Sequence, residues 1–336
     1  MFKGISMIKK NRRIKIRSTG VYLPDKVLTN ADLEKIVETS DEWITTRTGI
    51  KERRIAAKEQ VTSDLAEKAA KMALERAGLK AEDIDLILVA TNTPDTIFPA
   101  TACWLQKKLG IKETPAFDLE AGCSGFLYGL IVSEGLILGG VARRILLVGV
   151  DILSKVTNWE DRGTCVLFGD GAGAFILEES QDESGLISHF WGADGSLAEL
   201  LILPGGGTLH PGSEKTVEKK LHYITMKGNE VFKHAVKRMG EAALEALKQA
   251  GLGKDQVDYL IPHQANLRII DATGERLNLP KDKIVVNIHK YGNMSVATIP
   301  VALHELIEEG RLQPGKIIVM VAFGAGFTWA SAVYRW

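Results

Sequence analysis

The chain repeats itself at an interval close to half its length, and this repeat restricts the folds that it can adopt. The segment ERAGLKAEDIDLILVA at residues 75–90 resembles KQAGLGKDQVDYLIPH at residues 248–263. In both, a helical pattern ends at Ala-Gly-Leu and an Asp introduces an apolar run. Further positions recur at intervals of 170 to 173 residues, namely Gly78 and Gly251, Cys123 and Asn293, and Ile145–Val150 and Ile317–Ala322. Because the chain has 336 residues, two copies of one folding unit nearly fill it.

The sequence pattern of each copy predicts alternating helices and strands. Apolar residues recur at helical spacing over residues 62–77 and 228–250. The runs IDLILVA, RILLVGV, KIVVNI and KIIVMVA are short and continuous, which is typical of strands in a parallel sheet with helices on both faces. GDGAGAFILEE at 169–179 and FGAGFTWASAVYR at 323–335 each read as a Gly turn that leads into a strand. We therefore predict an α/β protein whose two pseudo-symmetric halves form five layers, αβαβα.

The repeat also sets the expected boundaries. We expect an N-terminal extension, a first half with Cys123, a loop-rich connection, and a second half with His263 and Asn293, at residues 1–12, 13–180, 181–226 and 227–336. Translation could begin at Met1 or at Met7, and the sequence leaves that choice open.

Composition excludes several classes of protein. The 42 Lys+Arg balance the 42 Asp+Glu, whereas proteins that coat nucleic acid need a strong basic excess. The basic N-terminus lacks the apolar run of a signal peptide, and no later segment reaches the roughly 18 apolar residues of a membrane span. Three scattered cysteines without a CxxC motif fit a reducing compartment. We expect a cytoplasmic protein that binds neither nucleic acid nor membrane.

Cys123 has the sequence setting of a nucleophile. In DLEAGCSGF, a strand-like segment passes through Ala-Gly into a helical pattern that begins at the Cys, and small neighbours leave its sulfur uncovered. The positive end of a helix dipole favours a thiolate at that position. The competing interpretation is a structural core Cys, and for Cys103 and Cys165 we prefer it.

His263 and Asn293 each follow an apolar run, in HQAN and in YGNMS. Functional loops of a parallel sheet gather outside the carboxyl ends of its strands. A single His or Asn is more often structural than catalytic. However, Cys123 and Asn293 occupy matching positions in the two copies, so the pseudo-symmetry predicts that all three side chains meet at one rim.

The motifs AGCSGF, DRGTCVLFGDGAGA, GNEVF, HQANLR, YGNMSVATIP and FGAGFTW occur in this order within residues 13–336. Together they resemble the family of 3-oxoacyl-[acyl-carrier-protein] synthase III, the initiating condensing enzymes of bacterial fatty-acid synthesis. The resemblance implies a thiolase-like fold, a homodimer, no metal or prosthetic group, and a catalytic triad of Cys123, His263 and Asn293. Such an enzyme transfers a short acyl group, often acetyl, from acyl-CoA to the Cys. It then condenses that group with malonyl-carrier protein and releases carbon dioxide and CoA.

This chemistry explains the residue types. The thiolate attacks the primer thioester, and the oxyanion that forms needs two backbone N–H donors. The resemblance assigns them to Cys123 and Ala325, although many members have Gly where this chain has Ala325. Decarboxylation of the malonyl group then places negative charge on its thioester oxygen, and His263 and Asn293 are expected to donate hydrogen bonds to it. His263 therefore acts as a neutral donor and not as a base.

The resemblance also implies three binding regions. CoA contacts are expected from the adenine-binding and phosphate-binding side chains and from the pantetheine channel, at Trp43, Arg47, Arg162, Gly228, Asn229, Phe232 and Asn266. An acidic carrier protein needs a basic docking surface, which we place at Lys233, Lys237, Gln264, Ala265, Asn266, Leu267 and Arg268. Phe98 matches a residue that crosses the dimer interface and caps the acyl pocket of the partner, which favours a short primer.

Several alternatives stay open. A related condensing enzyme or acyltransferase of secondary metabolism would keep the triad and change the substrates, and a non-catalytic acyl-CoA-binding protein would not need a nucleophile. The 3-hydroxy-3-methylglutaryl-CoA synthases use a Glu base, and we identify none near the Cys motif. GDGAGA at 169–174 lacks the following helix of a dinucleotide site, and the His residues show no metal-ligand spacing.

Overall fold

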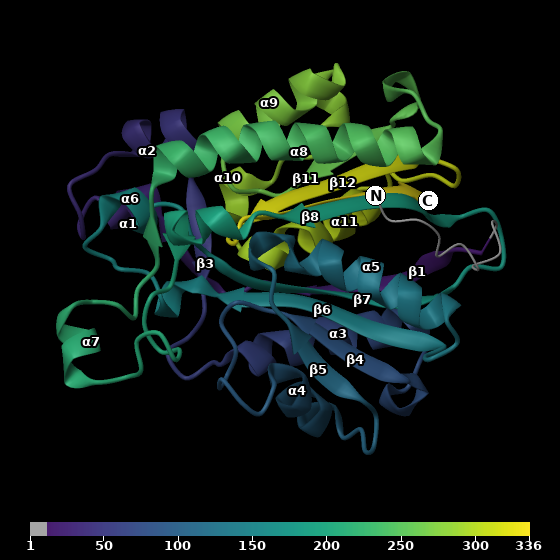
Figure 1. Cartoon of the computed structure of the whole chain (residues 1–336), viewed down its shortest axis with the longest axis horizontal. Helices are drawn as coiled ribbons and strands as arrows, with labels where there is room; N and C mark the ends of the chain where they lie inside the picture. Colours follow the sequence, from purple (N-terminus) through teal and green to yellow (C-terminus); the bar gives the residue numbers. More distant parts are fainter. Residues whose placement is uncertain (1–11) are drawn as a thin grey trace.

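Two β-sheets stack with helices between them and outside them in the computed structural model, which describes residues 12–336 (Figure 1). The predicted N-terminal extension lies outside the described residues except for Arg12. The five layers run from α3 and α4, through the first sheet, α5 with α11, and the second sheet, to α8 and α9. The predicted α/β class and the five-layered αβαβα arrangement are confirmed.

The first sheet comes entirely from the first half of the chain. Its strand order is β1-β7-β6-β4-β5, with bounds Ile14–Tyr22, Asp170–Glu179, Arg144–Ile152, Leu86–Ala90 and Ala116–Leu119. Strand β4 runs parallel to β5 and β6, whereas β7 is antiparallel to β6 and β1. The sheet is therefore mixed, and not wholly parallel as the apolar runs predicted. Its outer face is covered by α3 (Thr62–Ala77) and α4 (Thr101–Leu109).

The second sheet repeats this design. Its order is β11-β12-β13-β8, with bounds Tyr259–Pro262, Ile317–Gly324, Thr328–Arg335 and Gly185–Ala193. Strands β11 and β12 are parallel, and β13 is antiparallel to β12 and β8. Helices α8 (Gly228–Ala250) and α9 (Leu267–Leu277) cover the outer face.

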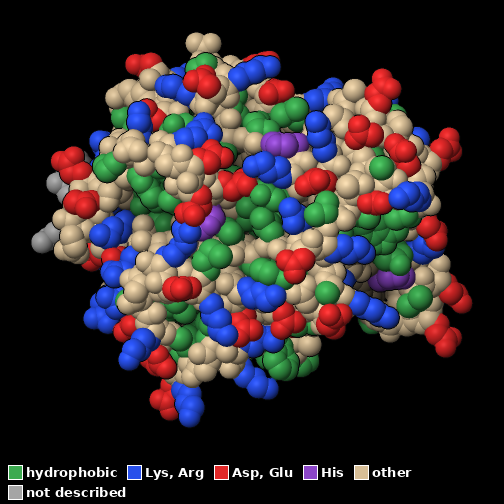
Figure 2. Space-filling model, turned by 180° about the vertical axis from the view of Figure 1, so that it is seen from behind, with side chains coloured by type: hydrophobic (Ala, Val, Ile, Leu, Met, Phe, Trp, Pro, Cys, Tyr) green, Lys and Arg blue, Asp and Glu red, His purple; other side chains and the backbone are tan. Residues whose placement is uncertain are grey.

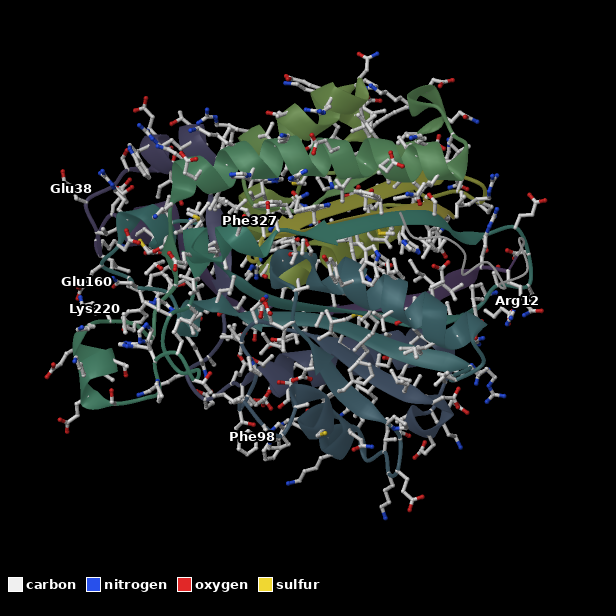
Figure 3. All side chains as sticks on the ribbon, viewed as in Figure 1. Arg12, Glu38, Phe98, Glu160, Lys220 and Phe327 are labelled. Atoms are coloured by element: carbon white, nitrogen blue, oxygen red, sulfur yellow. The ribbon has the colours of Figure 1, made fainter. Side chains whose placement is uncertain are left out.

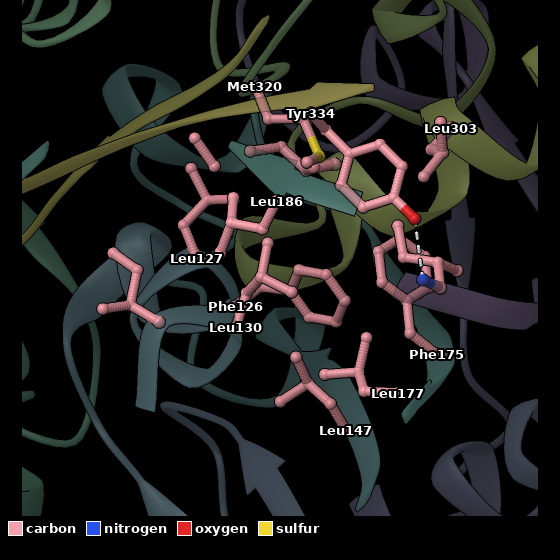
Figure 4. Packing of buried hydrophobic residues seen from close by; sticks show 14 of the residues in the cluster. Phe126, Leu127, Leu130, Leu147, Phe175, Leu177, Leu186, Leu303, Met320 and Tyr334 are labelled. Atoms are coloured by element: carbon pink, nitrogen blue, oxygen red, sulfur yellow. Dashed lines mark hydrogen bonds between the residues drawn. The ribbon is translucent and has the colours of Figure 1, made fainter. Parts of the chain in front are cut away.

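The central layer consists of α5 (Gly125–Leu138) and α11 (Thr298–Glu308), which contact both sheets. Helix α5 is apolar around its circumference, because it is buried between two sheets. The rings of Phe126 and Phe175 meet edge to face at 4.8 Å between centroids, and Tyr334 accepts a hydrogen bond from the Ile16 backbone N–H at 2.8 Å (Figure 4). Both central helices begin at the same place, where the two halves of the chain meet.

The predicted repeat is confirmed in three dimensions. Strands β1, β7, β6 and β4 correspond to β8, β13, β12 and β11, and both sheets have these strands in the same order. Helices α3 and α8 have the predicted bounds, and each ends at a glycine in the left-handed region, Gly78 with φ 64° and Gly251 with φ 70°. A left-handed C-cap costs a glycine little, which explains the Ala-Gly-Leu signature in both copies.

Three sequence-based expectations are wrong in detail. KIVVNI forms no strand and contributes only an isolated bridge between Ile284 and Leu260. The expected connection at 181–226 contains β8, which completes the second sheet. Gly171 and Gly173 lie inside β7 and not in a turn. Glycine is needed there because of close packing, since a Cβ would fall 2.5 Å from the Met294 sulfur at Gly171 and 2.6 Å from Pro300 at Gly173.

Shorter elements surround the carboxyl ends of the strands. They are the β2–β3 ribbon (Lys26–Thr29 and Glu52–Ile55), the β9–β10 ribbon (Leu201–Ile202 and Thr225–Met226), and helices α1 (Asn30–Leu33), α2 (Asp41–Thr48), α6 (Arg162–Cys165), α7 (Glu214–Glu218) and α10 (Ile288–Tyr291). The loop that carries α7 is tied back by an ion pair between Lys220 and Glu160 (Figure 3). Between residues 12 and 336, no helix combines the length and apolarity that crossing a membrane requires.

Candidate active site

Cys123 lies at the contact between the two halves of the chain. It occupies a single 3-10 turn, Gly122–Ser124, between β5 and α5. A Cβ on Gly122 would fall 2.4 Å from the Ala325 nitrogen, and one on Gly324 would fall 2.2 Å from the Cys123 nitrogen. Only glycine permits backbones to approach this closely. Two glycines, one from each half, therefore hold the turn with Cys123 against the end of β12.

Two cavities meet at Cys123. The first has a volume of about 350 Å³ and is also lined by His263, Asn293 and several of the predicted CoA-binding residues. The second, of about 540 Å³, extends past Cys123 on the other side and is lined by residues such as Glu120, Tyr128, Leu203 and Thr328. The predicted convergence of the three side chains on one site is thus observed, with a separate space beyond the sulfur.

His263 follows β11 and is 2% exposed. Burial lowers the pKa of its imidazole to about 3, so the ring is neutral at physiological pH. Its Nδ1 lies 2.7 Å from the Thr298 hydroxyl, at the start of α11, and this hydroxyl is also 2.9 Å from the Ser295 carbonyl oxygen. Because a hydroxyl has one proton, the tautomer of His263 depends on which of these two acceptors Thr298 serves.

Asn293 is oriented by the residue two positions later. Its Oδ1 accepts a hydrogen bond of 2.8 Å from the Ser295 backbone N–H, which identifies the oxygen end of the amide. The Asn293 backbone pairs with the segment after α6, because its N–H donates to the Leu167 carbonyl at 2.9 Å and its own carbonyl accepts from Gly169 at 3.0 Å. The amide nitrogen is therefore left free to donate, and Asn293 lines the first cavity.

The thiol of Cys123 is deeply enclosed, although part of the residue remains accessible from the cavities. Burial raises the pKa of Cys123 to about 12, and the negative charges of Asp151 and Glu120 act in the same direction. The predicted lowering by the helix N-terminus is thus outweighed by desolvation. The Ser295 hydroxyl opposes this effect by donating a hydrogen bond to Sγ at 3.3 Å.

Ala325 occupies the turn between β12 and β13. The left-handed φ of this turn falls on the next residue, Gly326, with φ 131°, and not on Ala325. Alanine is therefore accommodated without backbone strain where many members of the family have glycine. Its N–H belongs to the same backbone contact that holds the Cys123 turn, which fits the predicted pair of oxyanion donors.

Trp43 stands at the mouth of the first cavity between two arginines. The guanidinium of Arg47 lies 4.5 Å from its ring centroid and that of Arg162 lies 4.7 Å from it. Arg162 also donates to the Glu38 carbonyl at 3.1 Å. The space between Trp43 and Arg162 is therefore closed in this structure, and an adenine base that enters between them has to displace the guanidinium.

The other predicted CoA-binding residues lie along the same cavity. Gly228, Asn229 and Phe232 come from the first turns of α8. Asn266 caps α9 by accepting from the Arg268 N–H at 2.9 Å, and its amide donates to the Arg47 carbonyl at 2.9 Å. This second contact connects the two walls of the entrance.

The residues of the predicted docking surface differ in their exposure. Lys233, Lys237 and Arg268 are exposed, Arg268 lies over the Phe232 ring at 5.0 Å, and Lys233 pairs with Glu230 at 3.0 Å. The prediction is wrong for Gln264, which is 1% exposed and cannot touch another protein.

The surroundings of Gln264 explain this burial. Its amide nitrogen donates to the carbonyls of Pro262 and Val285, and its oxygen accepts from the Asn287 N–H. Nearby, Leu267 packs against Gly49, and Ala265 lines the first cavity. Gln264 therefore fixes the conformation of the loop, whereas Ala265 and Leu267 contact the first cavity and Gly49, respectively.

Phe98 lines neither of the two cavities that meet at Cys123, and it lies near the edge of the molecule in Figure 3. It is 84% exposed beside Ile97, which is 75% exposed, so the two form a projecting apolar tip. Of the other cysteines, Cys165 is buried as expected, whereas Cys103 is only partly buried, contrary to the core interpretation.

Reasoning from the sequence missed four polar residues around the nucleophile. Glu120, three positions before Cys123, lines the second cavity and accepts a hydrogen bond of 2.9 Å from the Gly122 N–H. A Glu therefore lies near the Cys motif, contrary to the expectation from the sequence. Ser295, Thr298 and Asp151 were also missed. YGNMSVATIP was a signal for the first two, but their contacts depend on the packing of the halves.

Two further observations concern charge on one face of the molecule and possible metal ligands. On the face seen in Figure 2, acidic and basic side chains are interspersed without a broad region of one sign. Within residues 12–336, no three His, Cys, Asp or Glu side chains gather in a way that could hold a metal ion.

Comparison with known proteins shows which proteins the chain is similar to. A family model described as 3-oxoacyl-[acyl-carrier-protein (ACP)] synthase III matches residues 117–195, and the C-terminal model of the same name matches residues 247–336. Over 321 residues the chain is 55% identical to a beta-ketoacyl-[acyl-carrier-protein] synthase III of Desulfitobacterium hafniense, covering 96% of this chain and 97% of the relative. The corresponding protein of Caldanaerobacter subterraneus is 54% identical, with the same coverage.

A solved structure agrees with these relatives. The crystal structure of 3-oxoacyl-[acyl-carrier-protein] synthase III from Aquifex aeolicus superimposes with a TM-score of 0.89 at 51% identity, and the match covers 96% of this chain and all of that one. The thiolase-like fold expected from the motifs is thereby confirmed.

Proposed function

This chain belongs to the 3-oxoacyl-[acyl-carrier-protein] synthase III family, the initiating condensing enzymes of fatty-acid synthesis, and we propose that Cys123, His263 and Asn293 carry its chemistry. The observation that supports this most strongly is their convergence on one cavity at the contact between the two halves. The substrates proposed are a short acyl-CoA, most simply acetyl-CoA, and malonyl-carrier protein.

In the first half-reaction, the sulfur of Cys123 attacks the carbonyl carbon of acyl-CoA. The backbone N–H groups of Cys123 and Ala325 stabilise the oxyanion. The C–S bond to CoA then breaks, and the thiol proton of Cys123 leaves on the CoA sulfur. The product is a thioester on Cys123, and the first cavity is vacated for the second substrate.

In the second half-reaction, the malonyl thioester loses carbon dioxide and its electron pair forms an enolate. His263 and Asn293 donate to the enolate oxygen, which requires the His263 proton on Nε2. That tautomer is the one in which Thr298 donates to Nδ1. The enolate carbon attacks the acyl carbon, the C–S bond to Cys123 breaks, and 3-oxoacyl-carrier protein is released. Cys123 leaves as a thiolate and takes up one proton from solvent, which restores the thiol. Because carbon dioxide departs in place of a proton, a neutral His263 suffices.

The residues at the entrance of the first cavity suit both proposed substrates, acyl-CoA and malonyl-carrier protein. Trp43, Arg47 and Arg162 provide an aromatic face and two cations for an adenine nucleotide. Exposed Lys233, Lys237 and Arg268 lie beside the same opening and suit an acidic carrier protein. The shared opening fits two substrates that deliver the same pantetheine arm in turn.

The second cavity is proposed to hold the acyl chain of the primer. It begins at Cys123 and is separate from the entrance. The exposed tip at Ile97 and Phe98 is the kind of apolar surface that a second copy of the chain covers. A homodimer in which Phe98 reaches the acyl cavity of the partner follows from this surface and from the family resemblance.

A condensation assay tests the proposal. Acetyl-CoA and malonyl-carrier protein should yield 3-oxobutyryl-carrier protein, carbon dioxide and CoA in equal amounts. An acyl-enzyme that forms but never consumes malonyl-carrier protein would instead support a chain-end acyltransferase.

A further inference from the structure

Ser295 contacts the catalytic centre through all of its polar groups. Its hydroxyl donates to the Cys123 sulfur at 3.3 Å, and its N–H donates to Asn293 Oδ1 at 2.8 Å. Its carbonyl oxygen lies 2.9 Å from the Thr298 hydroxyl, which is 2.7 Å from His263 Nδ1. We propose that the Ser295 hydroxyl is a further catalytic group that stabilises the thiolate of Cys123 during acylation. The inference rests on Cys123 being the nucleophile.

The direction of the Ser295 hydroxyl is set by Asn92. The two protons on Asn92 Nδ2 go to Asp151 Oδ2 at 2.7 Å and to Ser295 Oγ at 3.0 Å. Ser295 Oγ is therefore an acceptor in this contact, and its own proton is free for the sulfur. Asn92 acts as a positioning residue in this arrangement.

Asp151 fixes the position of Asn92 through hydrogen bonds. It is fully buried at the end of β6, and it accepts hydrogen bonds from Thr91, from the side chain and N–H of Asn92, and from the N–H and hydroxyl of Thr93. These donors fix the Asn92 amide, so the chain Asp151–Asn92–Ser295–Cys123 is held in one arrangement. A buried polar network in which every member is satisfied is rigid.

The backbone and the side chain of Ser295 have separable roles. The residue is 2% exposed and has φ 47°, a left-handed conformation that is uncommon for residues other than glycine. This conformation directs its N–H to Asn293, its carbonyl to Thr298 and its hydroxyl to Cys123. Any residue at this position supplies the two backbone groups, whereas only the hydroxyl reaches the sulfur.

The charged and titratable groups around Cys123 make such a donor useful. Asp151 on β6 and Glu120 beside the nucleophile turn both disfavour a thiolate, and His263 at the end of β11 is neutral. A hydrogen bond to an ion is stronger than one to a neutral group. The Ser295 hydroxyl therefore favours the charged form of the sulfur where burial and both carboxylates oppose it.

Alkylation of the full-length protein by iodoacetamide tests the inference. The thiolate attacks the iodoacetamide carbon, iodide leaves, and the thiol proton goes to buffer. For Ser295→Ala we expect alkylation of Cys123, measured by peptide mass spectrometry, to be about tenfold slower at each pH from 7 to 9. This factor corresponds to the loss of one hydrogen bond to an ion. Acetyl transfer should fall in parallel, and decarboxylation of malonyl-carrier protein should fall less.

Two further variants make the result decisive. Ser295→Gly also removes the hydroxyl but suits the left-handed φ, so it should fold at least as well and still alkylate slowly. Ser133→Ala is the matched control, because Ser133 is a fully buried Ser on α5 whose hydroxyl bonds to none of the described residues. It should alkylate at the wild-type rate.

The outcomes separate this inference from the proposed function. An alkylation rate unchanged in both Ser295 variants would overturn the inference. Wild-type protein that is alkylated at Cys123 but takes no acetyl group would instead contradict the proposed function.

Discussion

Gly324→Ala should disable acyl transfer while leaving most of the fold intact. The added Cβ would lie 2.2 Å from the Cys123 nitrogen, 2.9 Å from the Gly122 carbonyl carbon and 3.0 Å from the Ser124 nitrogen. All three are backbone atoms, so no side chain can rotate away. Normal van der Waals separation requires the end of β12 and the nucleophile turn to part by about 1 Å.

That displacement acts directly on the proposed oxyanion site. The two donors, Cys123 and Ala325, lie on opposite sides of the contact that Gly324 allows. Loss of one such donor typically costs about 100-fold to 1000-fold in rate, and overpacking costs about 1–3 kcal/mol in the free energy of unfolding. We expect acetyl transfer from acetyl-CoA to fall by at least about 100-fold, with a measurable but partial loss of stability.

The assay is the rate of acetyl-enzyme formation in a single turnover, measured together with thermal unfolding. Gly135→Ala is the matched control, because Gly135 lies on α5 with no atom within 4 Å of its added Cβ. It should be as active as wild type and slightly more stable, since alanine is favoured within a helix. Near-normal acetylation by Gly324→Ala would refute the view that this backbone contact forms the oxyanion site.

Three further predictions concern other parts of the site. Because burial lowers the pKa of His263 to about 3, the unfolded chain takes up a proton below about pH 6.5 that the folded ring refuses. The free energy of unfolding should therefore fall as the pH drops from 6.5 toward 3, and it should fall less steeply in His263→Ala. Denaturant titrations at several pH values measure it, and the same dependence on pH in both proteins would contradict the lowered pKa. Arg268→Glu should weaken condensation with malonyl-carrier protein and spare acylation by acetyl-CoA; an equal loss in both assays would exclude the docking role. Trp43→Ala should raise KM for acyl-CoA about tenfold, more than it lowers kcat, and initial-rate measurements in which only kcat changes would argue against an adenine contact.

The repeat predicted the bounds of two helices correctly, because those bounds depend on short segments of sequence. The Ala-Gly-Leu signature predicted the bounds of α3 and α8, since an apolar helical face and a left-handed glycine cap are both properties of a short segment. Ile284 shows the limit of this reasoning. Its run is as β-branched as a strand, yet it forms one bridge only, because the chain turns directly into the loop that Gln264 holds.

The parts of the site that sequence reasoning missed are contacts between distant segments. Gln264 looked like a surface residue of a binding loop, and its burial depends on carbonyl groups from Val285 and on the N–H of Asn287. Ser295 had no signature of its own, because its role depends on Asn92 and Cys123, which are far away in the sequence. The repeat predicted that Cys123, His263 and Asn293 meet, but the orientation of their side chains comes from the packing of the two halves.

The measurement that tests the central claim most directly is mass spectrometry of the protein after reaction with acetyl-CoA alone. The proposed site predicts one acetyl group per chain, located by peptide mapping on Cys123, and its disappearance when malonyl-carrier protein is added. The variant Cys123→Ala should take up none. Acetylation that maps to Cys103 or Cys165, or that persists in Cys123→Ala, would contradict the assignment of the shared site between the two halves.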